Sequence, residues 1–588
     1  MRIEPSERLI RARQSIDGEP GIEVLSDWHP YKRGQLAMSI GLTINIESDY
    51  VPRRTIWYVV ASNDYPSGRL EFFPAKEGGL SRTFPHQRLN VDTDDDVPHL
   101  GGDVCISDWY RKLNRYAHGV EIGDLLLGFQ VISLMEWLRR AAEGTLAQLG
   151  DPYELPQFTT DSSPILAYRE DAASFRFWRT CSEESGTAVI SAIPSFTNER
   201  RAWTIKRFLD SKGKDLQHPL LPQPMRNATF DPLPEETQRV KWVKLNWVPY
   251  LEPWHPPTTW GELRQCLGSS WFEFHRFLRA KPITRLILFG MPMPEVIGGP
   301  LVQLHWQALD LPNLVTVRDL RGWRPKARTL RMADVERPLA DGQPLSWMFS
   351  ENWAPAQMSR RYVTKAREHP NNVLLVGCGA IGSAIADFLV RGGTKKIWLC
   401  DGDVVHGGNL VRGTFEVTDV GRSKAESLRD HLRRANPNCE VWAQPTGIAY
   451  AKHRVPIRAV NWVFDCTGVD DVLRQVGTAE LQANARIVSL STTWEAERLL
   501  AVYSSPAAFD PERILTALRT AHQEARQPAA IQAEGIGCFH PAFPADPHRI
   551  TLHAAAALER IGQWEEGNGD PTAEYFDVES FSWIPIAI

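Results

Sequence analysis

The chain has 588 residues, of which 43% are hydrophobic and 23% charged, and its net charge at pH 7 is −5. These values are ordinary for a globular protein, and the length predicts roughly three domains. They exclude a general nucleic-acid or anionic-membrane surface, and no apolar run approaches the roughly 20 residues of a membrane span. The eight cysteines form no C-x-x-C pair, which is typical of free thiols in a reducing cytosol and argues against a structural zinc site. The amino terminus has no signal-peptide pattern, so we expect a cytoplasmic protein.

Residues 1–150 have the pattern of one α+β domain. The expected elements are a helix (6–15), strands (36–46, 54–61 and 70–73) and a second helix (125–138). Between the last strand and the second helix lies Gly101-Gly-Asp-Val-Cys105. A cysteine in such a loop can be exposed and partly ionised, and can then accept an acyl group by thioester exchange. Taken alone, Cys105 is more often a buried structural cysteine.

This order of elements resembles a ubiquitin-conjugating enzyme. The resemblance implies that Cys105 is the thioester cysteine. Where that family has His-Pro-Asn shortly before the cysteine, this chain has Pro85-His86-Gln87, with Asn90 and His99 nearby. We expect His86 to keep the structural role of the family's histidine, and the residue that stabilises the oxyanion stays open.

The sequence pattern of residues 151–355 predicts an α/β linker domain. Strand-like runs occur at residues 174–178, 187–193, 241–248 and 284–289. The acids and histidines of this region show no spacing that distinguishes a site from solvated faces. We therefore predict no catalytic residue here.

Residues 356–588 contain the most specific motif of the chain. Gly377, Gly379 and Gly382 form G-x-G-x-x-G between an apolar run and a helical pattern, and Asp401 ends a second apolar run. The glycines let the backbone approach a phosphate at the start of a helix, and an acid about 20 residues later is placed to accept hydrogen bonds from ribose hydroxyls. The pattern predicts a Rossmann-like nucleotide-binding domain. Its elements are expected at 373–376 (strand), 383–390 (helix) and 396–400 (strand).

The residues after Asp401 indicate which nucleotide chemistry is expected. Asp403 is followed by Asn409, Arg412 and Lys424. An amide and two cations near the phosphates would neutralise the charge that develops on a triphosphate as a carboxylate attacks its α-phosphorus. This favours ATP-dependent adenylation over hydride transfer. The alternative is that the Arg and Lys are solvated residues of a polar loop.

The constellation D-x-D-x-V-x-x-x-N-L-x-R, followed by G-x-x-K, resembles the adenylation domain of ubiquitin-activating enzymes and of bacterial ThiF/MoeB proteins. The resemblance implies that Asp401 binds ribose and that Asn409, Arg412 and Lys424 contact the ATP phosphates. It also implies that an arginine ahead of the glycines reaches ATP, often across a dimer. The candidates for this role are Arg360, Arg361 and Arg367.

A magnesium ion must screen the triphosphate, and Asp465, at the end of a buried strand, is the first candidate ligand. The family usually has a second aspartate three residues later, where this chain has Gly468. Asp470 is therefore the second candidate.

Cys538 is the candidate for a second thioester cysteine, as ubiquitin-activating enzymes have. It follows Gly535 and Gly537 and precedes His540, which could lower the pKa of the thiol. A structural cysteine is the alternative. Cys378 and Cys466 are expected to be packing residues.

The whole layout resembles the fused activating–conjugating enzymes of bacterial CBASS antiphage operons. The resemblance implies that the carboxyl terminus of a carrier protein, a cGAS/DncV-like nucleotidyltransferase, is adenylated with ATP and Mg²⁺. The acyl group then passes from Cys538 to Cys105 and on to lysine amines of target proteins. A homodimer is also implied, with no membrane or direct nucleic-acid partner. The alternatives are a ThiF-like enzyme that activates a small sulfur or ubiquitin-like carrier, a nucleotide-dependent oxidoreductase, and a nucleotide sensor.

Overall fold

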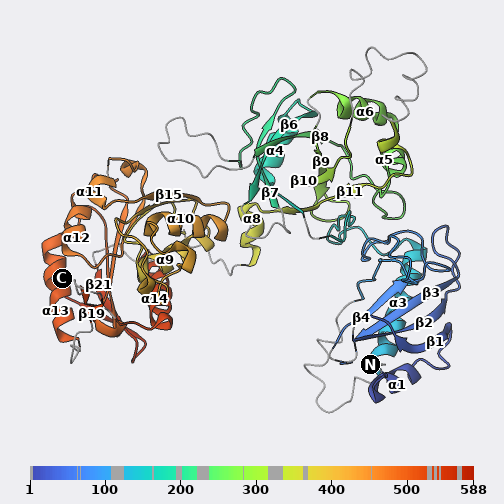
Figure 1. The fold of residues 1–588 in the computed structure, drawn as a ribbon, viewed down its shortest axis with the longest axis horizontal. Helices are drawn as coiled ribbons and strands as arrows, with labels where there is room; N and C mark the ends of the chain where they lie inside the picture. Colours follow the sequence, from blue (N-terminus) through green and yellow to red (C-terminus); the bar gives the residue numbers. More distant parts are fainter. Residues whose placement is uncertain are drawn as a thin grey trace. The chain divides into compact units, whose positions relative to one another are not determined.

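In the computed structural model the chain forms two compact units, the first ending at Ala354 and the second continuing from Pro355. Figure 1 labels their helices and strands. It describes residues 4–32, 34–62, 64–66, 68–106, 125–161, 164–193, 202–221, 237–281, 284–314, 336–361, 369–451, 453–525, 533–534, 540–541, 544–565 and 572–587. No helix within these ranges is long and apolar enough to cross a lipid bilayer. The expected division into three domains stays a prediction.

The first unit begins with a four-stranded antiparallel sheet of order β1-β2-β3-β4. Its elements are α1 (Glu7–Gln14), β1 (Ile22–Pro30), β2 (Gln35–Thr43), β3 (Arg54–Ser62), β4 (Leu70–Pro74) and α3 (Leu126–Glu143). In α3, Leu127, Val131, Leu134 and Leu138 recur every three or four residues and are buried against the sheet. The expected helices and strands are confirmed. Strand β1 was not expected, because its alternate residues are only half-buried and polar residues interrupt the apolar pattern.

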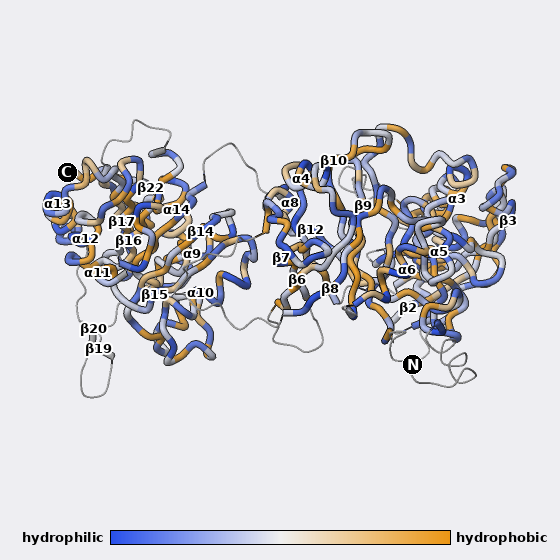
Figure 2. The backbone as a smooth tube through the Cα atoms, turned by 90° about the horizontal axis from the view of Figure 1, so that it is seen from above, coloured by the Kyte–Doolittle hydropathy of each residue, from blue (hydrophilic) through white to orange (hydrophobic). Residues whose placement is uncertain are grey.

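An eight-stranded sheet of order β11-β10-β9-β8-β6-β7-β5-β12 follows in the same unit. Its strands are β5 (Ile165–Tyr168), β6 (Ser185–Ile193), β7 (Ala202–Leu209), β8 (Thr237–Lys244), β9 (Leu286–Pro294), β10 (Leu301–Asp310), β11 (Ser346–Trp347) and β12 (Phe349–Asn352). The helices are α4 (Ala172–Thr180), α5 (Trp260–Leu267) and α6 (Trp271–Arg279). Strand β9 is hydrophobic on both faces (Figure 2): Ile287 and Phe289 pack with α5 and α6, whereas Leu286 and Leu288 pack with α4.

The prediction of a strand at residues 174–178 is wrong. The alternation of Phe175 and Phe177 imitates a strand, but this segment lies in α4. Asp171 accepts hydrogen bonds from the first N–H groups of the helix and forms a capping box with Ser174. Phe175 and Trp178, three residues apart, then form the buried stripe of the helix.

The second unit contains an eight-stranded sheet of order β15-β14-β13-β16-β17-β18-β21-β22. Its strands are β13 (Val373–Val376), β14 (Lys396–Cys400), β15 (Glu440–Gln444), β16 (Trp462–Asp465), β17 (Arg486–Thr492), β18 (Arg498–Ser504), β21 (Thr572–Asp577) and β22 (Ser582–Ile586). The helices are α9 (Ala380–Arg391), α10 (Lys424–Ala435), α11 (Ile448–Ala451), α12 (Asp470–Gly477), α13 (Pro511–Glu524) and α14 (Pro547–Glu565). The five strands from β15 to β17 are parallel, and β18, β21 and β22 continue the sheet antiparallel. The α/β fold class with a Rossmann-like C-terminal part is confirmed.

The order of the parallel strands reverses between β13 and β16. Residues from α9, α10 and α14 pack on one face of the sheet and residues around α11 and α12 on the other. Ligands of doubly wound sheets bind beyond the carboxyl ends of the strands at this reversal. The fold therefore places a binding site where β13 and β16 end.

Candidate active site

The carboxyl ends of three neighbouring strands, β14, β13 and β16, lie at one level, and β17 extends beyond them to Thr492. Val376 pairs with Cys400 on one side and with Asp465 on the other, and Asp465 pairs with Ser489. The residues that follow these strand ends therefore meet at one edge of the sheet. The glycine turn follows β13, and Asp401 follows β14.

The three glycines of the turn have different reasons for lacking a side chain. Gly377 has φ of +88°, and a Cβ on Gly382 would lie 1.8 Å from the carbonyl oxygen of Gly377. At both positions the backbone conformation or the close approach of the backbone requires a glycine. A Cβ added at Gly379 would meet no atom within 4 Å, and Gly379 lines the cavity described below. Its empty side is thus available to a ligand.

Asp401 braces the glycine turn. Its Oδ2 accepts a hydrogen bond of 2.6 Å from the N–H of Cys378, and its Oδ1 accepts one of 2.8 Å from the N–H of Asp403. Burial raises the pKa of the carboxyl group. Asp401 does not line the cavity, so the structure gives it a bracing role, and its contact with ribose stays a prediction.

A cavity of about 420 Å³ lies at the reversal of strand order. Of the predicted residues, those that line it are Gly379, Asn409, Arg412, Lys424, Asp465 and Asp470, whereas Gly377, Gly382, Asp401 and Asp403 lie outside its lining. Its volume is in the range of small-molecule sites, about 300–1,000 Å³.

The cations expected at the phosphates are positioned by their neighbours. Lys424 is the first residue of α10, and its Nζ lies 3.0 Å from Oδ2 of Asp403. The side chain of Lys424 is only 12% exposed, whereas that of its partner Asp403 is 75% exposed. Asn409 accepts a hydrogen bond from the N–H of His406, which fixes the turn that leads to Arg412.

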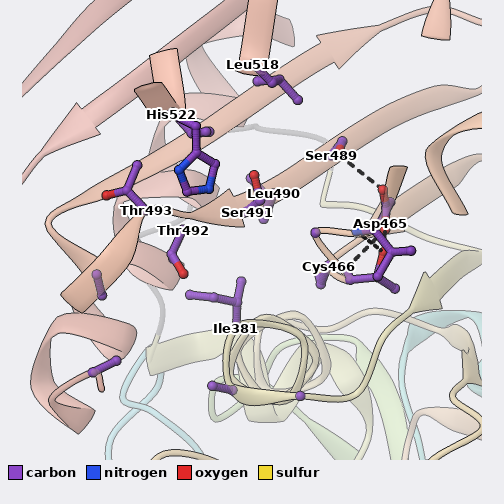
Figure 3. A pocket seen from close by; sticks show the side chains of 18 of the residues that line it. Ile381, Asp465, Cys466, Ser489, Leu490, Ser491, Thr492, Thr493, Leu518 and His522 are labelled. Atoms are coloured by element: carbon purple, nitrogen blue, oxygen red, sulfur yellow. Dashed lines mark hydrogen bonds between the residues drawn. The ribbon is translucent and has the colours of Figure 1, made fainter. Parts of the chain in front are cut away.

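Asp465 is the acid of the cavity. It is 1% exposed, and its oxygens accept hydrogen bonds from the N–H and hydroxyl of Thr467 and from the hydroxyl of Ser489 (Figure 3). Burial raises the pKa of the carboxyl group. Magnesium is usually bound by one or two carboxylates together with substrate phosphates, so a single buried carboxylate at the cavity wall fits this ion. The described residues contain no preformed cluster of three or more acidic, histidine or cysteine side chains.

The region of the missing second aspartate is built differently. Gly468 has φ of +64°, a conformation that favours glycine. Asp470, on α12, lies 2.5 Å from the guanidinium of Arg519 on α13, and both side chains line the cavity. The second magnesium candidate is therefore already paired with a cation.

Several lining residues were not identified from the sequence. Ser491, Thr492 and Thr493 follow one another at the end of β17, and His522 lies on α13 opposite Asp465 (Figure 3). A run of hydroxyl residues at a strand end was the available signal. The contribution of α13 had none, because only tertiary packing brings that helix to the cavity.

The cysteines separate into two groups. Cys378 is buried, and burial raises the pKa of the thiols of Cys378 and Cys466, in agreement with packing roles. Cys105 is exposed. Cys538 lies outside the described residues, between β19 (Ala533–Glu534) and β20 (His540–Pro541), in which Glu534 pairs with His540.

The arginines ahead of the glycines are only partly described. The segment that contains Arg360 and Arg361 begins as α8 (Pro355–Met358) and continues as a 3₁₀ turn (Ser359–Arg361). Arg360 is exposed. The side chain of Arg361 and the whole of Arg367 lie outside the description.

The surroundings of Cys105 are formed by the segment that contains His86. The N–H of Cys105 donates a hydrogen bond of 2.8 Å to the carbonyl of His86. Three other candidates for the oxyanion are occupied elsewhere. The amide nitrogen of Gln87 donates to Gly102, that of Asn90 donates to Leu80 and Arg82, and His99 is buried between Tyr31 and the carbonyl of Leu100.

Comparisons with known proteins match nearly the whole chain. Residues 144–353 match the family model of the Cap2 central linker domain, and residues 351–520 match that of the ThiF family. The chain is 30% identical over 567 residues to the ATP-dependent ubiquitin transferase-like protein Cap2 of Enterobacter hormaechei, covering 93% of this chain and 92% of that protein. It is 34% identical over 120 residues to the mouse adenylyltransferase and sulfurtransferase MOCS3, covering 20% of this chain and 26% of that one.

Among solved structures, E. coli MccB with ATP is 17% identical, covers 37% of this chain and 62% of its own, and has a TM-score of 0.27. That score is too low to support an inference.

Proposed function

Because this chain belongs to the Cap2 family of ATP-dependent ubiquitin transferase-like proteins, we propose that it joins the carboxyl terminus of a carrier protein to lysine amines of target proteins. The chain is a ubiquitin-activating-like enzyme that uses ATP. The proposal adds the steps of the reaction and the residues that carry them out.

The observation that carries the proposal is the convergence of Asn409, Arg412, Lys424 and Asp465 on one cavity beside the glycine turn. The open side of Gly379 allows a phosphate to approach the start of α9. Arg412 and Lys424 bind the triphosphate and neutralise the charge that develops as the carrier's carboxylate attacks the α-phosphorus. An oxygen–phosphorus bond forms, pyrophosphate leaves, and an acyl-adenylate results.

Magnesium is the expected companion of ATP here, and Asp465 is the residue that would hold it. The ion would supply positive charge that stabilises the transferring phosphoryl oxygens. The hydroxyls of Thr467 and Ser489 orient the Asp465 carboxylate, as supporting hydrogen bonds do for metal ligands. The pairing of Asp470 with Arg519 leaves Asp465 as the favoured ligand.

The acyl group then passes through two thioesters. Cys538 displaces AMP from the adenylate, Cys105 receives the acyl group by thioester exchange, and a lysine amine takes it to form an amide. Each exchange replaces one thioester by another, so adenylation supplies the driving force. The exposure of Cys105 supports its place as the last carrier, because a large target must reach it.

The partners are proposed from the family. The carrier is a cGAS/DncV-like nucleotidyltransferase with a free carboxyl terminus, the setting is CBASS antiphage defence in the cytoplasm, and the enzyme works as a homodimer. Family membership supports a protein substrate with a free carboxyl terminus.

The test uses exchange of labelled pyrophosphate into ATP, with the nucleotidyltransferase as the carrier. We expect exchange with the intact carrier and none when its last residue is removed. Cys105→Ala should leave exchange intact and abolish conjugation to targets, whereas the control Cys181→Ala should change neither. Conjugation by Cys105→Ala would refute the relay, and a thioester on Cys105 in Cys538→Ala would refute its order. Lack of exchange with this carrier, but exchange with a small sulfur carrier, would favour a ThiF-like function.

A further inference from the structure

His86 lies directly opposite Cys105 across a short antiparallel pairing. Gln87 forms a bridge with Val104, and the N–H of Cys105 donates to the carbonyl of His86. Exposure alternates along both segments: Gln87 and Val104 are buried, whereas His86 and Cys105 are exposed. The backbone hydrogen bond places His86 and Cys105 side by side, and both are exposed. The two residues therefore share one solvent-facing edge.

His86 is held by a single carboxylate oxygen. Oε2 of Glu154 accepts a hydrogen bond of 3.1 Å from the backbone N–H of His86 and lies 2.8 Å from its Nδ1. In a regular pair that N–H would bond back to Cys105. Here it is directed to Glu154, and His86 has φ of +62°, a conformation that is unfavourable for a residue with a side chain. Glu154 thus fixes both the backbone and the ring of His86.

Glu154 is itself anchored. The preceding residue, Tyr153, donates from its N–H to the carbonyl of Glu295 and packs edge-on against Trp254. A second contact fixes the same segment three residues before His86: the hydroxyl of Thr83 lies 2.9 Å from Nδ1 of His255, and both residues are buried. The His86–Glu154 contact, with side chains 49% and 43% exposed, therefore lies beside a packed junction.

We propose that His86 and Glu154 form a proton-transfer dyad for acyl transfer from Cys105, in which His86 is the base and Glu154 positions it. This rests on the proposed role of Cys105 as the last thioester. With Nδ1–H bound to the carboxylate, Nε2 carries the lone pair that accepts a proton. The Glu154 carboxylate stabilises the imidazolium that forms.

The step balances as follows. The amine lone pair forms the nitrogen–carbon bond of the amide, and the electron pair of the carbon–sulfur bond leaves with the sulfur of Cys105. The proton lost by the amine passes to Nε2 of His86 and from there to the thiolate. The products are an amide and the free thiol.

The test requires no protein carrier. Cys105 of the full chain is acylated with the mercaptoethanesulfonate thioester of acetylglycine, the site is located by peptide mass mapping, and loss of the acyl group to added free lysine is timed. His86→Ala should slow this loss by about 100-fold or more, and added imidazole should recover part of the rate. Glu154→Gln should slow it by about 10-fold, with Glu154→Asp in between. The controls His29→Ala and Glu184→Gln, both exposed residues of the same unit, should react like the wild type.

The outcomes separate the two proposals. A His86→Ala chain that transfers at the wild-type rate, or a loss that imidazole does not recover, overturns the dyad alone. Thermal unfolding of each variant shows whether the loss comes from unfolding. If Cys105 of the wild type takes no acyl group, or keeps it in the presence of lysine, the relay fails as well.

Discussion

The nucleotide cavity and the Cys105 edge are built on opposite principles. The cavity lies at the ends of parallel strands, three of which end at one level, and its buried acid, Asp465, is 1% exposed and accepts three hydrogen bonds. The Cys105 edge has one isolated bridge, a left-handed histidine and exposed side chains. Its order is imposed by a residue 68 positions away in the chain.

The difference shows which parts of the structure hold the residues of each site in position. Adenylation requires charged groups that are held in fixed positions around the ATP phosphates. The edge of a sheet supplies such a rigid framework. In the proposed relay, transfer from Cys105 has to admit an amine on a folded target, which the exposure of Cys105 allows. The accessible segment around His86 is held by a residue distant in the chain, Glu154 of the same unit. The following substitutions break or sharpen this contrast.

The largest effect is expected from Gly382→Ala in the cavity frame. The added Cβ would lie 1.8 Å from the carbonyl oxygen of Gly377, which only a backbone shift can relieve. We expect the second unit to lose about 3 kcal/mol or more of unfolding free energy in urea denaturation. The matched variant Gly379→Ala, which meets nothing within 4 Å, should lose less than about 1 kcal/mol yet bind ATP more weakly. Equal stability of the two variants would contradict the rigid frame.

Lys424→Met removes a charge from the cavity without disturbing its walls. Because Lys424 lines the cavity and is proposed to bind the triphosphate, we expect pyrophosphate exchange to fall by about 100- to 1,000-fold. The exposed Lys395, at the opposite end of the neighbouring strand, provides the control Lys395→Met, which should change exchange less than about twofold. If Lys424→Met lowered exchange only a few-fold, the alternative that this lysine is a solvated loop residue would be favoured.

Asp103→Asn tests the Cys105 edge. Burial raises the pKa of Asp103 to about 6, and Oδ1 accepts a hydrogen bond from the N–H of Phe72. The folded chain therefore holds this proton more tightly than the unfolded chain. The resulting stability is complete below about pH 4 and is lost as the pH rises through about 6.

Asparagine keeps the acceptor oxygen but carries no charge. Asp103→Asn should therefore be more stable than the wild type by about 2 kcal/mol at pH 8, and the difference should shrink towards pH 5. Urea denaturation at several pH values measures it. A difference that is independent of pH would mean that Asp103 is not destabilised by burial.

The smallest difference is expected between the two magnesium candidates. Asp465→Asn should raise the Mg²⁺ concentration for half-maximal exchange by about 10-fold or more. Asp470→Asn should change it by less than about twofold and cost at most about 1 kcal/mol of stability, because its partner Arg519 is an exposed residue. If Asp470→Asn raised this Mg²⁺ concentration more than Asp465→Asn does, Asp470 would be the favoured magnesium ligand.

The sequence was sufficient where local chemistry decides the outcome. The glycine turn, its flanking strands and the cations after Asp401 follow from residues close together in the chain, and the structure brings Asn409, Arg412 and Lys424 to one cavity. It was not sufficient where distant segments meet. Nothing near Glu154 indicates that it contacts His86, and α13 reaches the cavity only through packing.

The buried contact between Thr83 and His255 has a consequence for how this chain can be divided. A fragment cut near residue 150 would lose both His255 and Glu154, and with them the supports of the segment opposite Cys105. The covalent link between the two halves of the first unit would then do more than tether them, since one half supports the other. A fragment that is meant to keep this segment in place should extend to Ala354, where the first unit ends.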